Sequence, residues 1–126
     1  CFARTAQFAM DQKLFLVNFS ALQPTPATRL YDRLESEGRL LYPQWWTDPA
    51  YRYGEAAFRP TRMTPQALTD GCLRARRQFF RPRSIARRAR SANASSPARL
   101  GVFLGANLLA RRALRDKLGK PLGACP

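Results

Sequence analysis

The stretch LFLVNFSAL, residues 14–22, constrains the fold more than any other part of the sequence. Apolar residues occupy nearly all positions of both alternating sets, so a strand formed here would be apolar on both faces. Such a strand is typical of a parallel sheet that is covered on its two sides. Each unpaired backbone group would cost about 1–3 kcal/mol in an apolar setting, so the strand requires neighbouring strands.

The flanking sequence predicts helices on both sides of this strand. A helix is expected over 3–13, and the turn QPTPAT at 23–28 leads to a helix capped by Thr25 or Thr28 and ended by Gly38. An Arg33–Glu37 pair is expected on that helix. EAAF at 55–58 could form a short extended segment, but 14–22 is the one strand that the pattern clearly predicts. Its neighbours are therefore expected in another part of a larger α/β protein.

The second half of the chain predicts further helices. Thr64 and Pro65 open a helix over 64–80, and Ser96 and Pro97 open a helix over about 97–118. Between them, RPRSIARRARSANAS at 81–95 predicts a weaker helical stretch that is interrupted at Pro82. The helix over 64–80 has an apolar stripe of Leu68, Cys72, Ala75 and Phe79. The last helix has a main stripe of Leu100, Phe103, Leu104, Leu108, Leu114 and Leu118, interrupted by Asn107 and Arg111. Val102 and Leu109 lie opposite, which predicts packing on two partners.

Composition excludes several classes of chemistry. The chain has no histidine, and Cys1, Cys72 and Cys125 have no metal-ligand spacing, so a zinc site and His-based catalysis are not expected. The three thiols are expected to be reduced in a cytoplasmic compartment. No apolar run reaches the ~18–20 residues of a membrane span, and no signal peptide is recognised.

The ordered series FAMDQKLFLVNFSALQPTPATRLYDRLESEG, MTPQALTDGCLRARRQFF and SIARRA resembles the C-terminal region of radical SAM enzymes with an N-terminal cobalamin (B12)-binding domain. The resemblance covers about residues 3–118. It implies an α/β fragment, mostly α: the last helix–strand–helix of a radical SAM-type barrel and a helical C-terminal extension. The implied segments are the barrel end at 1–38, an aromatic and proline-rich connection at 39–63, and the basic extension at 64–126.

The resemblance also implies cofactors and a site in the complete enzyme. That enzyme would use a [4Fe–4S] cluster, S-adenosylmethionine and, as one option, cobalamin; these residues alone lack the cluster motif, and no activity is expected from them. Asn18 and Ser20 on the strand face, and Pro26 and Thr28 in the turn, are the candidates to lie near S-adenosylmethionine or substrate. The family usually has glycine where this chain has Ala27. If that position has a positive φ, the alanine is strained by about 1–2 kcal/mol.

The charge suggests an alternative function. The chain carries a net charge of +14, and almost all of the excess lies in residues 64–126. It could be a stand-alone basic helical module that binds nucleic acid or an anionic membrane surface. Nucleic acid is disfavoured because no known module pattern is present. Attachment to the periphery of a membrane stays open, as does a truncated, non-functional gene product. The anionic-surface candidates are Arg74, Arg77, Arg81, Arg87 and Arg88.

Overall fold

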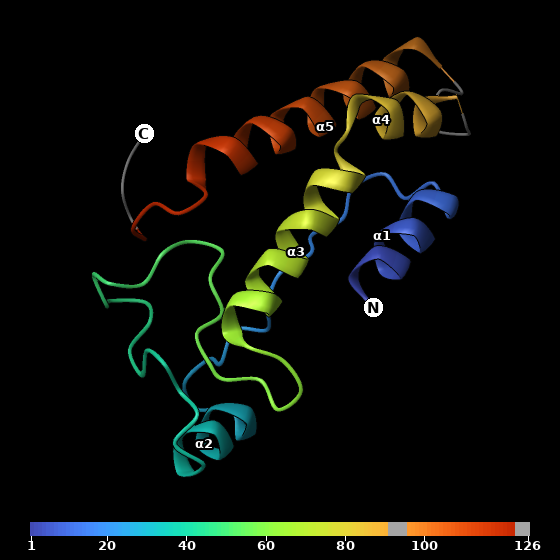
Figure 1. Ribbon diagram of the computed structural model, residues 1–126. Helices are drawn as coiled ribbons and strands as arrows, with labels where there is room; N and C mark the ends of the chain where they lie inside the picture. Colours follow the sequence, from blue (N-terminus) through green and yellow to red (C-terminus); the bar gives the residue numbers. More distant parts are fainter. Residues whose placement is uncertain (91–95, 123–126) are drawn as a thin grey trace. The chain divides into compact units, whose positions relative to one another are not determined.

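The computed structural model describes residues 1–90 and 96–122, and these residues are mostly helical (Figure 1). The prediction of a mostly α chain is confirmed. The five helices among them are α1 (Phe2–Asp11), α2 (Arg29–Ser36), α3 (Pro65–Phe79), α4 (Pro82–Ala89) and α5 (Pro97–Lys117).

Three of these helices begin where the sequence signals predict. The Oγ1 of Thr28 accepts a hydrogen bond from the N–H of Tyr31 at 3.3 Å, and the Oγ1 of Thr64 accepts one from Ala67 at 3.1 Å. The Oγ of Ser96 does the same for the N–H of Arg99 at 3.2 Å. Each cap satisfies a backbone donor that has no partner within the helix.

The segment 14–22 does not form a β-strand. It is extended, and the β-pairing in the described part of the chain consists of two isolated antiparallel bridges, Leu40 with Phe58 and Arg52 with Pro121. A strand is defined by its partner, and no other described segment forms a β-bridge with 14–22. No barrel is therefore seen in residues 1–90 and 96–122.

The chain divides into two compact units. The first unit comprises residues 1–19 and 72–116, and the second comprises 20–71 and 117–126. The division into 1–38, 39–63 and 64–126 was predicted for a larger protein and stays a prediction. Each unit is described below by itself.

The first unit packs α1, the extended segment, the end of α3, α4 and α5 around aromatic side chains. Its core is formed by Ala9, Met10, Phe79 and Phe80, with Val17, Phe19 and Ala110 against it. The rings of Phe19 and Phe79 pack edge to face, with their centroids 5.8 Å apart. Those of Phe15 and Phe103 pack in the same way, with their centroids 5.3 Å apart. The predicted stripe of α3 is confirmed, because Cys72, Ala75 and Phe79 are buried.

Helix α5 buries the predicted stripe only in part: Phe103 is buried, and Leu100 and Leu114 are half-buried. Phe103 and Asn107 are its fully buried side chains, whereas Leu104 and Leu108 of the predicted stripe are exposed. The stripe centres on Asn107 because this amide hydrogen-bonds inside the unit. The opposite side, with Val102 and Leu109, is exposed, and no second partner covers it within the described residues.

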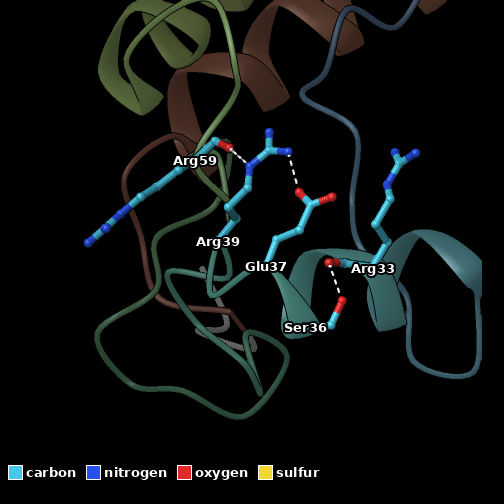
Figure 2. Close-up of polar contacts among 5 residues, drawn as sticks. All are labelled: Arg33, Ser36, Glu37, Arg39 and Arg59. Atoms are coloured by element: carbon cyan, nitrogen blue, oxygen red, sulfur yellow. Dashed lines mark hydrogen bonds and ion pairs between the residues drawn. The ribbon is translucent and has the colours of Figure 1, made fainter.

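The second unit holds α2 against the aromatic connection. The Nε of Arg39 donates to the carbonyl of Arg59 at 2.8 Å, and its Nη1 contacts Glu37 at 2.7 Å (Figure 2). The predicted Arg33–Glu37 pair is wrong. Figure 2 shows the Arg33 side chain directed away from Glu37, whose carboxylate lies beside Arg39 instead. Arg39 lies three residues beyond the end of the helix, where side-chain spacing within the helix gives no guidance.

Candidate functional site

Within the first unit, side chains from three helices bind the carbonyl groups of the extended segment. The Nη1 of Arg88 donates to the carbonyls of Leu14 at 2.9 Å and Phe15 at 3.3 Å. The Nδ2 of Asn107 also donates to the Phe15 carbonyl, at 3.1 Å. The segment is thus anchored by side chains from helices rather than by a neighbouring strand.

A third anchor lies further along the same segment. The Nε of Arg76 donates to the carbonyl of Phe19 at 2.5 Å, and its Nη2 donates to the Oδ1 of Asn18 at 2.9 Å. Sequence reasoning missed this role of Arg76. Its position four residues after Cys72, beside the apolar stripe of α3, was the available signal.

Arg88 is not an anionic-surface residue, contrary to the sequence prediction. It is 0 % exposed, and its Nη2 donates to the carbonyl of Phe79 at 3.1 Å and to the Oδ1 of Asn107 at 3.0 Å. Its guanidinium carbon lies 3.7 Å from the centre of the Phe79 ring, a cation–π geometry. Burial lowers the pKa of Arg88 to about 10, so the side chain stays charged at neutral pH. Carbonyl groups and an aromatic face replace the water that a surface arginine would have.

The other four arginines predicted to face an anionic surface are exposed: Arg74, Arg77, Arg81 and Arg87. Arg87 contacts the carboxylate of Asp11 at 3.3 Å. Phe79 and Phe80 lie within the core beside them and offer no exposed ring on which a base could stack. This surface therefore presents charge without aromatic stacking.

The four residues predicted to lie near S-adenosylmethionine or substrate are exposed: Asn18, Ser20, Pro26 and Thr28. Asn18 belongs to the first unit, and the other three belong to the second. The Oδ1 of Asn18 is occupied by Arg76. Thr28 is occupied at the start of α2, where its Oγ1 also donates to the carbonyl of Thr25 at 2.6 Å. Their predicted role is untested.

The turn before α2 contains a strained residue. Ala27 has φ of 61°, in the left-handed region that glycine adopts without cost. The condition stated for this position is therefore met, and the expected strain is about 1–2 kcal/mol. The hydrogen bonds of Thr28 on either side of the turn hold the chain in this conformation.

Aromatic residues of the second unit pack against the same turn. The indole N–H of Trp45 donates to the carbonyl of Pro24 at 2.9 Å, and the hydroxyl of Tyr51 accepts a hydrogen bond from the amide of Gln23 at 2.8 Å. Tyr51 is buried, and burial raises the pKa of its hydroxyl. The Oε1 of Gln23 is a buried acceptor without a hydrogen bond among the described residues. The aromatic and proline-rich connection at 39–63 is thus packed against the turn in this unit.

The donor groups of the described residues do not fit an iron–sulfur cluster. Among residues 1–90 and 96–122 there is no group of three or more His, Cys, Asp or Glu side chains placed to hold a metal ion. Cys72 is buried in the stripe of α3 and Cys1 is exposed, while Cys125 lies outside the described residues.

Within the described part of the chain, no helix combines the length and the apolar character needed to cross a bilayer.

Comparison with known proteins gives one match. Residues 28–102 match the model of a domain of unknown function, DUF4070, which is known from the C-terminal region of B12-binding radical SAM proteins. No curated protein and no solved structure matches the chain. The match covers more than half of the 126 residues, and the chain belongs to the DUF4070 family.

Proposed function

We propose that this chain is the C-terminal portion of a B12-binding-type radical SAM enzyme. Its role there is structural: it supplies the last barrel strand, 14–22, and a helical extension that holds this strand in place. The family match supports this context, because the domain is known from that region of such proteins. The cluster, S-adenosylmethionine and cobalamin are assigned by the proposal to other parts of the complete enzyme.

The observation that carries the proposal is that the backbone N–H groups of residues 15–19 have no acceptor within the described residues. Nearby side chains remain in solvent, with Leu14, Phe15 and Leu16 exposed by 41 %, 39 % and 50 %. Free donors next to exposed apolar side chains are what an internal strand presents when its neighbours are absent.

The helical anchors explain how the segment stays extended without those neighbours. Arg76, Arg88 and Asn107 bind carbonyls of Leu14, Phe15 and Phe19 and leave the N–H groups of residues 15–19 available. In the complete enzyme these N–H groups, which alternate between the two edges of a strand, would pair with neighbouring strands. Asn18, Ser20, Pro26 and Thr28 would then lie toward the mouth of the barrel, near S-adenosylmethionine or substrate.

Hydrogen exchange in two forms of the protein tests this proposal. An immunoblot against residues 14–38 first identifies the native polypeptide in the source cells, and that polypeptide is purified. Amides 15–19 are expected to exchange rapidly in the 126-residue chain and slowly in the native polypeptide. Amides 75–79 of α3 serve as the control, because they are helical and should be protected in both.

Two results would contradict the proposal. The first is a native polypeptide no larger than 14.3 kDa, which leaves no room for the missing strands. The second is a larger polypeptide in which amides 15–19 still exchange as fast as in the isolated chain. If the larger polypeptide protects these amides, its iron, acid-labile sulfide and reductive cleavage of S-adenosylmethionine are the next measurements.

A further inference from the structure

The outward face of α5 carries a continuous apolar surface, defined here as the α5 apolar face. Val102, Leu108 and Leu109 on it are exposed by 65 %, 57 % and 68 %. The same side contains Ala98, Gly101 and Gly105, and a side-chain carbon added at either glycine would meet no atom within 4 Å. Three turns of this helix side therefore carry no charged group.

Arginines border this face at its C-terminal end. Arg112 and Arg115 continue the same side of α5 after Leu109, and both are exposed. Arg112 has a carboxylate nearby, that of Asp116 at 3.8 Å, with both side chains largely in solvent. An exposed pair of this kind is weak and leaves the arginine able to bind another anion.

The net charge of the first unit indicates which kind of partner can bind the α5 apolar face. Residues 1–19 and 72–116 contain fourteen basic and two acidic side chains, a net charge of +12, whereas the second unit has a net charge of +2. Both acidic residues, Asp11 and Asp116, lie beside arginines. Most of the excess positive charge thus lies in the unit that carries the α5 apolar face.

We propose that the α5 apolar face binds the surface of an anionic lipid bilayer. Val102, Leu108 and Leu109 would enter the boundary between headgroups and acyl chains, and Arg112 and Arg115 would contact lipid phosphates. Exposed leucine and valine next to arginine are the side chains that interfacial helices use. Each basic side chain near such a surface adds attraction to anionic lipids.

Two other occupants fit the described residues less well. A second copy of the chain would bring two units of charge +12 together, and their repulsion opposes that contact. A nucleic acid would be attracted by the arginines, but exposed leucines would contribute nothing to its binding. The rings of Phe79 and Phe80, on which bases could stack, are buried.

Co-sedimentation of the chain with lipid vesicles tests the proposal. The vesicles contain phosphatidylcholine alone or phosphatidylcholine mixed with phosphatidylglycerol. The chain is expected to bind the mixed vesicles, and not the neutral ones, in a manner that weakens with added salt. The variant Leu108→Gln/Leu109→Gln should lower the partition coefficient about tenfold or more, because it removes the inserted apolar groups.

Matched variants separate the α5 apolar face from general properties of the chain. Leu22→Gln changes a leucine that is 61 % exposed in the second unit and should leave binding unchanged. Arg112→Gln/Arg115→Gln should weaken binding about fivefold for each arginine removed. Arg33→Gln/Arg62→Gln removes the same charge from exposed positions of the second unit and should have a much smaller effect. Circular dichroism and urea midpoints confirm that each variant folds.

Several results would overturn the proposal. Equal binding to neutral and anionic vesicles would do so, as would binding that Leu108→Gln/Leu109→Gln leaves unchanged in a folded variant. A concentration-dependent dimer that this variant abolishes, without vesicle binding, would assign the face to a second copy. Salt-dependent binding to polyuridine, again without vesicle binding, would assign the arginines to nucleic acid.

Discussion

The side chains of Arg88 and Asn107 meet at 3.0 Å inside the first unit, and neither is exposed to solvent. Arg88 lies on α4 and Asn107 on α5, so this contact joins two helices through residues that are nineteen positions apart in the sequence. The same two side chains also bind the Phe15 carbonyl. A buried charge is tolerated here because backbone carbonyls, the Asn107 amide oxygen and the Phe79 ring face the guanidinium.

The losses of stability from replacing Arg88 and from replacing Asn107 should not be additive. Asn107→Leu is expected to lower the free energy of unfolding by about 2–3 kcal/mol, because it leaves the buried guanidinium short of an acceptor. Arg88→Met should cost a similar amount by leaving carbonyls unpaired. In the double variant the loss should be smaller than the sum by about 1 kcal/mol or more.

Urea unfolding of the four proteins measures this coupling. Arg87→Met is the control on the same helix, because Arg87 is exposed and its change should stay within about 0.5 kcal/mol. Additive losses for Arg88 and Asn107 would contradict the described contact.

Backbone strain at Ala27 predicts a substitution that raises the stability of the chain instead of lowering it. Ala27→Gly should raise the free energy of unfolding by about 1 kcal/mol, because glycine accepts the φ of 61° that alanine resists. Gly38→Ala is the matched change, since Gly38 has φ of 62° and an added Cβ would meet no atom within 4 Å. It should lower stability by about 1–2 kcal/mol through the backbone alone. Thermal unfolding of both variants checks the pair, and a loss of stability in Ala27→Gly would show that the turn is not strained.

Helices and their starting points could be predicted from this sequence because their signals are local. Thr28, Thr64 and Ser96 lie a few residues from the backbone donors that they cap, so the sequence alone specifies the contact. The condition placed on Ala27 could be stated for the same reason, since the turn is defined by its own residues.

Other features depend on contacts between distant residues. The burial of Arg88 depends on the carbonyl of Leu14, seventy-four residues away, and Arg76 pairs with Asn18 across fifty-eight positions. From sequence alone, an arginine on a helix is predicted to be exposed to solvent, because such distant partners cannot be identified. The strand at 14–22 was wrong within this chain because strand formation requires a partner, which residue pattern alone does not supply.

The reactivity of the cysteines tests the burial of α3. Burial raises the pKa of the Cys72 thiol, and the thiolate is the form that reacts with disulfide reagents. A chain that keeps only Cys72 should therefore react about a hundredfold more slowly than one that keeps only Cys1, which is exposed. Both should react alike in concentrated urea. Rapid labelling of Cys72 in the folded chain would place it outside the stripe.

Alkaline pH should weaken the second unit through Tyr51. Burial raises the pKa of its hydroxyl, so the folded state keeps this proton at a pH where the unfolded state loses it. The contribution of Tyr51 is complete below the unfolded pKa of about 10 and is lost as pH rises through the raised folded pKa. Urea midpoints measured from neutral to alkaline pH should fall more steeply for the wild type than for Tyr51→Phe. Parallel curves would indicate that this hydroxyl ionises freely in the folded chain.

The two units are interleaved along the chain, which crosses between them after residues 19, 71 and 116. Neither unit corresponds to one uninterrupted length of coding sequence. A recombination event, a deletion or a designed truncation cannot remove one unit and leave the other whole. The DUF4070 match at 28–102 includes parts of both. The pair of units is therefore expected to be inherited, exchanged between genes and lost as one module.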